Sequence, residues 1–321
     1  MRFDLTAPNI VIPAQDRPAL VTFARQSIAR GSKSFAAASR LFDRTTRERV
    51  WLLYAWCRKC DDMADGQDHG GAMEAVADPM ARLAIIRELT AKALVGKPTG
   101  EPAFDCFGIV ARDCGLTQKM ADDVIEGFAL DAADWHPRRE TDLYRYCYHV
   151  AGAVGVMMAV VMGVETDDDA TLDRACDLGL AFQLANIARD IEEDDAAGRC
   201  YLPDDWLADL DIEPGEHMRP HNRKRLALMA RWLADEAGQY EASARVGAVS
   251  LPFRARWAVL SAAGIYGDIA RQVRATGEHA WDHRIYTSRR DKLGWVRKAF
   301  GDAVFNKPRL MDRDGLWTRP R

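Results

Sequence analysis

Apolar residues recur at the spacing of an α-helix through most of this chain, and the strict alternation that is typical of β-strands is nearly absent. In the segment 178–185, for example, apolar side chains return every three or four residues. Glycines that can end helices are spread along the chain, at Gly66, Gly96, Gly115, Gly163 and Gly198. Thr117 and Thr141 stand where they could cap the starts of helices. The pattern predicts an all-α fold of about ten helices.

The composition is that of an ordinary globular protein. Of 321 residues, 48% are hydrophobic and 29% are charged. No linker of low complexity divides the chain, so we predict a single domain. The first residues lack a secretion signal, and seven thinly spread cysteines indicate reduced thiols in the cytoplasm. The longest apolar run, residues 150–164, is shorter than the about 20 residues of a membrane-spanning helix and predicts a buried helix.

Two acidic clusters each end a predicted helix. The first contains Asp61, Asp62 and Asp65, and the second contains Asp190 and Asp194. Aspartates four residues apart share one helix face and repel each other, and the C-terminal end of a helix disfavours negative charge. A cation would offset both costs. Because Mg²⁺ is held by carboxylates and by the phosphates of substrates, we predict two facing metal-binding walls of one cavity.

Polar side chains continue each cluster along its helix. On the second helix they form one stripe, made of Gln183, Asn186 or Ile187, Asp190 and Asp194. A solvated helix end would explain Asp194, but it explains Asp190 less well. Arg58 and Arg189 stand beside the two clusters, and arginine suits phosphate oxygens. Paired acidic walls with nearby arginines favour a diphosphate substrate bridged by Mg²⁺.

Other motifs carry less weight. The Cys57–Cys60 pair lacks the context of a redox or zinc site, and His279 with His283 lacks the glutamate of a zinc protease motif. The segment 31–35 is not a Walker motif, because the upstream glycine and strand are missing. Its hydroxyls and Lys33 could nevertheless contact phosphate.

The C-terminal part is basic although the whole chain has a net charge of −4. From Arg284 to the end there are 11 Lys and Arg against 4 Asp. Aromatic residues are interleaved with them, at Trp295, Phe300, Phe305 and Trp317. This pattern suits an anionic membrane surface. A solvated tail is the favoured interpretation and membrane contact the second; nucleic acid is not expected, because no nucleic-acid module is present.

Several of these segments occur together and in order in the squalene and phytoene synthase family of head-to-head prenyltransferases, which this chain resembles. They are Gly-Ser-Lys-Ser-Phe at 31–35, the segment 54–65, Tyr-Cys-Tyr-His-Val-Ala-Gly-Ala-Val-Gly at 146–155, and Gln-Leu-Ala-Asn-Ile-Ala-Arg-Asp at 183–190 with its continuation to 203. The resemblance covers residues 20–300. It leaves residues 1–19 as an N-terminal extension and 301–321 as a basic C-terminal tail. Within the family, the chain is most similar to the bacterial phytoene synthases.

The resemblance implies the all-α class I isoprenoid synthase fold, one domain with helices around a central cavity. The implied ligands of Mg²⁺, or of Mn²⁺ as the alternative metal, are Asp61, Asp62, Asp65, Asn186, Asp190 and Asp194. The implied substrate-binding residues are Ser32, Lys33, Ser34, Arg58, Gln183, Asn186, Arg189, Tyr266 and Arg284. The implied catalytic residues are Asp61, Asp65, Asp190, Asp194 and Tyr146. Ala153 and Ala185 depart from the family pattern, which often has threonine there.

The reaction that the resemblance implies joins two geranylgeranyl diphosphates through prephytoene diphosphate to phytoene. It releases two diphosphates, needs no nicotinamide cofactor, and is the first committed step of carotenoid biosynthesis. The alternatives are dehydrosqualene or squalene synthesis from two farnesyl diphosphates and, more remotely, a non-catalytic helical assembly factor. We expect a cytoplasmic protein, with contact at the inner face of the membrane as an added prediction. The sequence leaves the oligomeric state open.

Overall fold

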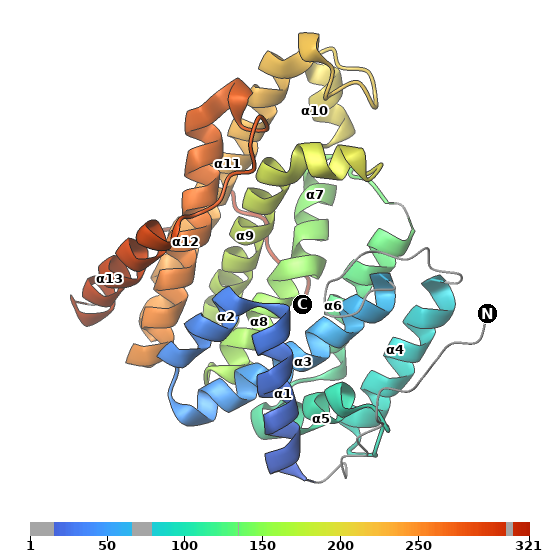
Figure 1. Cartoon of the computed structure of the whole chain (residues 1–321), viewed down its shortest axis with the longest axis vertical. Coiled ribbons are helices and arrows are strands. Elements are labelled where there is room, and N and C mark those ends of the chain that lie inside the picture. The colour runs from blue at the N-terminus through green and yellow to red at the C-terminus, as the bar shows by residue number, and fades with distance from the viewer. Residues whose placement is uncertain (1–15, 66–78, 134, 306–310) are drawn as a thin grey trace.

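The computed structural model describes residues 16–65, 79–133, 135–305 and 311–321. Within these ranges it contains thirteen α-helices and no β-strand, which confirms the all-α prediction (Figure 1). The helices are α1 (Arg17–Gly31), α2 (Lys33–Ala38), α3 (Arg44–Asp65), α4 (Pro79–Leu94), α5 (Pro102–Cys114), α6 (Gln118–Ala132), α7 (Glu140–Cys147), α8 (Ala153–Val161), α9 (Asp169–Ala196), α10 (Asp204–Asp209), α11 (Arg223–Gly247), α12 (Phe253–Thr276) and α13 (Arg289–Phe305). The count exceeds the expected ten because α2, α7 and α10 span only six to eight residues, too few for a clear apolar period.

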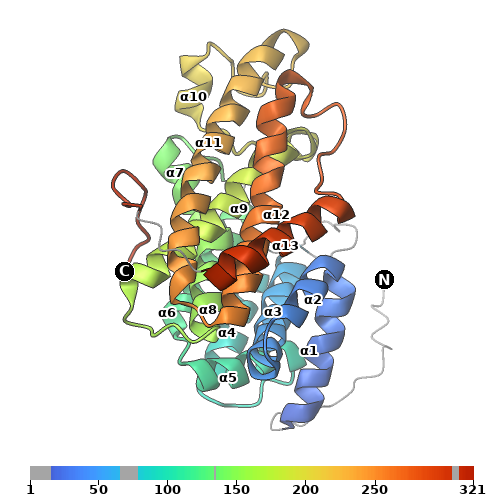
Figure 2. The same ribbon diagram turned by 90° about the vertical axis from the view of Figure 1, so that its left-hand side faces the viewer.

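The helices form two packed groups that meet at α8. Helices α1, α3, α4, α5 and α6 make one group, and α9, α11, α12 and α13 make the other (Figures 1 and 2). Helix α8 packs against both α3 and α9, and the π-helical segment Tyr148–Gly152 before it packs against both α6 and α9. Apolar stripes at helical spacing hold each group together; in the first, Trp56 of α3 stacks on Phe107 of α5 with ring centroids 4.2 Å apart. The two helices that carry the acidic clusters, α3 and α9, therefore belong to different groups.

Glycines bring α9 unusually close to the segment before it. A Cβ atom at Gly155 would lie 2.5 Å from the carbonyl oxygen of Ala175, and one at Gly179 would overlap the backbone of Ala151. No side chain fits at either position without moving the backbone. The predicted buried helix at 150–164 is confirmed in its main part, because α8 is largely buried, but it starts with a π-helical turn.

The predicted helix ends are mostly correct. Gly115 and Gly198 have φ values of 75° and 76°, the left-handed conformation that favours glycine after a helix. Thr117 caps α6, since its Oγ1 accepts a hydrogen bond from the backbone N–H of Met120. The Thr141 prediction was wrong, because α7 begins one residue earlier at Glu140. Gly66 lies outside the described residues.

The C-terminal segment 311–321 is docked on the protein, so the prediction of a solvated tail was wrong for these residues. Arg313 donates two hydrogen bonds, of 2.7 and 2.8 Å, to the buried carboxylate of Asp177 on α9. The backbone N–H of Trp317 donates to the hydroxyl of Tyr240 on α11, and its ring lies 5.7 Å from that of Tyr148. Helix α13 continues through residue 300, where the tail was expected to begin. Among the described helices, none is both long and apolar enough to cross a membrane.

Candidate active site

The first acidic cluster surrounds one arginine near the end of α3. Nη1 of Arg58 lies 2.9 Å from Asp61, and its Nε and Nη2 donate hydrogen bonds of 2.9 and 2.6 Å to Asp62. Asp62 is buried, whereas Asp61 is 38% exposed. Three predicted site residues have side chains outside the described part of the structure: Lys33, Ser34 and Asp65. The described carboxylates of this cluster are thus held by Arg58, one turn before them on the same helix.

The segment 31–35 lies directly against this cluster. A Cβ atom at Gly31 would overlap the hydroxyl of Tyr54 and lie 3.5 Å from Cδ of Arg58, so a larger residue would displace the Tyr54 side chain. The ring of Phe35 lies 5.7 Å from that of Tyr54. Ser32 caps α2, because its Oγ accepts a hydrogen bond from the backbone N–H of Phe35. Two motifs separated in the sequence are therefore brought together, as a common site requires.

The second acidic cluster lies on a polar stripe of α9, as the helical spacing predicts. Gln183, Asn186, Asp190 and Asp194 are all half-buried, while the apolar side chains between them are buried. Ile187 is only 3% exposed, which assigns the ambiguous position of the stripe to Asn186. The stripe therefore faces away from the core over three turns of the helix.

Two arginines bind Asp190 from different parts of the chain. Arg189 donates from Nε at 2.7 Å to one carboxylate oxygen and from Nη2 to the other. Arg284 reaches the same carboxylate at 2.9 Å and also binds Glu193 at 2.6 Å. Arg284 is 55% exposed, so this contact is open to solvent. Its place at the second cluster agrees with the substrate-binding role that the resemblance implies.

Tyr266 also lies at the second cluster. It stacks on Phe182 of α9, with ring centroids 4.2 Å apart, and is 38% exposed. Burial tends to lower the pKa of Arg189, but the hydrogen bond and charge of Asp190, with a smaller contribution from Tyr266, raise it overall. The second cluster thus combines acidic, basic and exposed aromatic groups.

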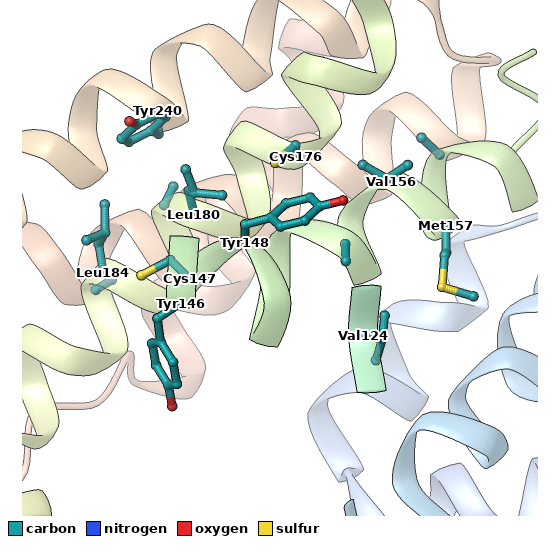
Figure 3. Close-up of a cluster of buried hydrophobic side chains, with 14 of the residues drawn as sticks. Val124, Tyr146, Cys147, Tyr148, Val156, Met157, Cys176, Leu180, Leu184 and Tyr240 are labelled. Carbon is teal, nitrogen blue, oxygen red and sulfur yellow. The ribbon is translucent and has the colours of Figure 1, made fainter. Parts of the chain in front are cut away.

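Tyr146 belongs to an aromatic stack with a shared acidic partner. Its hydroxyl donates a 2.9 Å hydrogen bond to Asp131 at the end of α6, and Tyr201 donates one of 3.3 Å to the same oxygen. The Tyr146 ring lies between Trp135 and Tyr201, at 5.3 and 4.8 Å. Figure 3 shows its hydroxyl pointing away from the apolar cluster around Leu184. Burial, with the nearby charge of Asp131, raises the pKa of Tyr146 well above its usual range, so it stays a neutral donor.

Sequence reasoning missed two members of this group. Tyr201 stands in the Tyr-Leu-Pro segment that carried the family resemblance, so a signal for it was available. Asp131 had none, because it stands apart from the other aspartates of α6 and belongs to no motif. A pocket of about 230 Å³ opens beside these residues and is also lined by Arg199.

Electrostatics connect this aromatic group to the second cluster. Burial raises the pKa of Asp194 to about 6, and the negative charge of Asp190 is the next cause. Asp131 adds to this effect, while Arg199 opposes it. Acidic groups of α6 and α9 are therefore close enough to repel each other, and positive charge placed between them would relieve the repulsion.

The side chains of the two clusters offer oxygen ligands that suit a hard divalent cation. Carboxylates and an amide oxygen are the ligands that Mg²⁺ and Mn²⁺ prefer. Within the described residues no three acidic, histidine or cysteine side chains are gathered as a metal site, and Asp65 lies outside that set. Arginines pair with Asp61 and Asp62 in the first cluster and with Asp190 in the second. Metal binding, and the prediction that the two clusters face one another, therefore stay predictions.

Comparisons with known proteins agree with the fold and the motifs. The chain matches the family described as squalene/phytoene synthase over residues 28–291. It is 48% identical to a phytoene synthase of Pseudescherichia vulneris over 308 residues, which are 95% of this chain and 99% of that protein. It is 45% identical to a 15-cis-phytoene synthase of Pantoea ananas over 309 residues, with the same coverage of 95% and 99%.

Solved structures share the architecture. A dehydrosqualene synthase in complex with a ligand matches with a TM-score of 0.79 and 24% identity, covering 92% of this chain and all of that one. A squalene synthase from Alicyclobacillus acidocaldarius matches with a TM-score of 0.72 and 22% identity, covering 83% and 97%. These similarities confirm the predicted isoprenoid synthase fold.

Proposed function

The chain belongs to the squalene/phytoene synthase family, and on that premise we propose that it joins two molecules of geranylgeranyl diphosphate into phytoene. One observation carries this proposal: relatives named phytoene synthase are 45–48% identical over nearly their whole length. The chain is then a prenyltransferase at the entry to carotenoid biosynthesis. The proposed catalytic domain, residues 20–300, contains the matched region.

We propose that the two acidic clusters hold Mg²⁺, or Mn²⁺ in its place, through the six residues that the resemblance implies. These are Asp61, Asp62, Asp65, Asn186, Asp190 and Asp194. When bound, the metal would neutralise diphosphate oxygens and so favour departure of the leaving group. Burial and, next, the charge of Asp190 raise the pKa of Asp194, so a cation beside it would stabilise its ionised form. Removal of divalent metal should then stop the reaction, and either metal should restore it.

The arginines at the clusters are placed to bind diphosphate oxygens. Arg58 lies at the first cluster, and Arg189 and Arg284 lie at the second. Ser32, Lys33 and Ser34 belong to the segment that approaches Arg58, so we propose that they bind the same diphosphate. Separate basic groups at two clusters suit a reaction that uses two diphosphate substrates.

The chemistry balances with two diphosphates and two protons released. Breaking the bond between carbon and diphosphate oxygen in one substrate gives an allylic cation, which the double bond of the second substrate attacks. Loss of a proton closes the cyclopropane of prephytoene diphosphate. Its own diphosphate then leaves, the cation rearranges, and a second proton is lost to give the central double bond. A released diphosphate is the candidate acceptor for the protons.

Aromatic side chains flank each cluster and can protect such cations. Phe35 and Tyr54 lie at the first, and Phe182 and Tyr266 at the second. Aromatic faces attract positive charge and exclude the water that would quench a carbocation. Tyr146, fixed by Asp131, adds a neutral hydroxyl near the second cluster. We propose that it orients a substrate there.

Synthesis of dehydrosqualene from two farnesyl diphosphates is the second candidate, favoured by the structural similarity to a dehydrosqualene synthase. Incubation of the purified protein with Mg²⁺ and either substrate, with and without NADPH, separates the candidates by hydrocarbon analysis. We expect a hydrocarbon built from two geranylgeranyl units, with a central conjugated triene, to form without NADPH. A product formed only from farnesyl diphosphate would overturn the proposed substrate. No product from either substrate would favour the non-catalytic alternative.

We propose that the enzyme is cytoplasmic and that its product passes into a membrane, because a long hydrocarbon is poorly soluble in water. Reversible contact with the membrane surface then belongs to the proposed function. No direct nucleic-acid partner is proposed.

A further inference from the structure

Helix α13 exposes large apolar side chains on its outer face. Leu293, Phe300, Val304 and Phe305 are 71%, 45%, 51% and 75% exposed. Leu293, Phe300 and Val304 are seven and four residues apart, so they share one face of the helix. An adjacent face is already used, because Ala299 and Ala303 are buried. Phe300 also packs on α12, with its ring 5.1 Å from that of Trp257, whereas Leu293, Val304 and Phe305 are more than half exposed.

These residues are concentrated at one place in the molecule. Half of the exposed large apolar side chains among the described residues lie on α13 or beside it. The other two members are Phe253, whose ring lies 5.9 Å from Phe300, and Tyr286, which is 73% exposed. Figure 2 shows α13 lying across α12, with no other described helix in front of it. Such a concentration commonly marks an interaction surface.

The charged side chains on the outer face of α13 are basic. Arg289, Arg290, Arg297 and Lys298 are exposed, and in the described part of the chain the three arginines form no ion pair. The two acidic residues of α13 are turned elsewhere: Asp291 accepts a hydrogen bond from Ser288, and Asp302 is half-buried, 3.9 Å from Arg245. The outer face of α13 thus combines apolar and positively charged groups.

The C-terminal segment has no comparable face. Arg313, Arg319 and Arg321 all bind aspartates of α9. The sequence grouped the basic and aromatic residues of α13 and of 311–321 into one tail. The residues of 311–321 contact the rest of the protein and stabilise the fold, whereas those of α13 remain accessible.

We propose that the outer face of α13 docks on an anionic membrane surface. Exposed arginines attract anionic lipid headgroups, and the apolar side chains between them can enter the boundary with the acyl chains. A second copy of this chain is a poorer occupant, because a two-fold contact would oppose the same basic residues to each other. The proposal goes beyond the proposed function by naming the surface and the lipid class.

The docking face is close to the site along the chain. Only four residues separate Arg284, which binds Asp190, from Arg289, the first residue of α13. Thr287 anchors this connection, since its buried hydroxyl donates to the carbonyl of Ile265. A membrane bound to α13 would therefore lie near the second acidic cluster, where an apolar substrate or product must pass.

The test is flotation of the full chain with vesicles of phosphatidylcholine alone or mixed with phosphatidylglycerol, at low and high salt. We expect binding to the mixed vesicles that weakens with salt. The double variant Leu293→Ser/Phe305→Ser should lower the bound fraction by about tenfold. Arg290→Glu/Arg297→Glu should remove the salt-sensitive part. Product formation in detergent should be unchanged for both, which shows that they fold.

Matched controls change equivalent residues elsewhere. Met80→Ser/Val95→Ser removes apolar side chains that are 69% and 68% exposed, and Arg25→Glu/Arg112→Glu reverses exposed charges far along the chain. Both controls should bind vesicles like the unmodified protein. Equal binding to neutral vesicles, no binding, or equal losses in the controls would overturn the proposal. So would a change in molecular mass caused by the Leu293 and Phe305 substitutions. Because flotation uses no substrate, its outcome is independent of the proposed reaction.

Discussion

The two halves of α9 carry the same acidic pattern in opposite surroundings. Asp169, Asp173 and Asp177 follow one another at four-residue spacing in the N-terminal half, as Asp190 and Asp194 do in the C-terminal half. In the first half the counter-charges come from the chain's own C-terminal segment. In the second half they come from arginines that lie at the proposed active site.

The aspartates in the two halves of α9 differ in their burial and in their partners. Asp177 is fully buried and receives hydrogen bonds from Arg313 and Ser243. Arg284, by contrast, is 55% exposed at Asp190, and within the described residues Asp194 has no ion pair. Aspartates four residues apart therefore do not identify a metal site without their surroundings. What distinguishes the proposed site is that one of its carboxylates, Asp194, has no arginine partner among the described residues, whereas the three aspartates of the N-terminal half each have one.

The largest expected effect is on turnover, from a substitution in the C-terminal half of α9. Asp190→Ala should lower diphosphate release by about 10³-fold or more, because it removes a proposed ligand of the metal that would stabilise the leaving diphosphate. The midpoint of chemical unfolding should change little. Steady-state release of diphosphate from geranylgeranyl diphosphate measures the first effect. Asp169→Ala, in the other half, is the control and should keep turnover; retained turnover in Asp190→Ala would refute the metal assignment.

The next largest effect is on stability, from the loss of a buried ion pair in the N-terminal half of α9. Arg313→Ala should lower the free energy of unfolding by about 3 kcal/mol, since it leaves the buried carboxylate of Asp177 without its cation. Urea unfolding measures the loss. Adding Asp177→Asn should recover part of it by removing the buried charge. If Arg313→Ala is as stable as the unmodified protein, the C-terminal segment does not stabilise α9.

A smaller effect is expected at the exposed arginine of the second cluster. Arg284→Ala should raise KM for geranylgeranyl diphosphate by about tenfold, because it removes a diphosphate contact, without a measurable change in stability. Steady-state kinetics with the purified protein measure this change in KM. Arg284→Lys should restore part of the affinity, and an unchanged KM would exclude Arg284 from substrate binding.

The smallest effect is expected for an exposed ion pair of the N-terminal half. Arg321 is 59% exposed, so Arg321→Ala should cost less than about 1 kcal/mol in urea unfolding. A loss as large as that of Arg313→Ala would mean that exposure does not separate the contributions of the two arginines.

The sequence was sufficient for features that depend on residues a few positions apart. Helix α9, its polar stripe and its end at Gly198 follow from spacing and from the conformational freedom of glycine. The family motifs then identified the fold and placed Tyr266 and Arg284, which no local pattern singled out.

Long-range contacts remained invisible because nothing in the local sequence encodes them. Asp131 meets Tyr146 only when α6 packs beside the segment before α8, and Arg313 reaches Asp177 across 136 positions of the chain. The amino-acid pattern alone established an all-α enzyme fold with two acidic clusters. Tertiary packing decided which carboxylates receive buried arginines and which basic residues stay exposed, because burial and counter-charge depend on the neighbours that folding supplies.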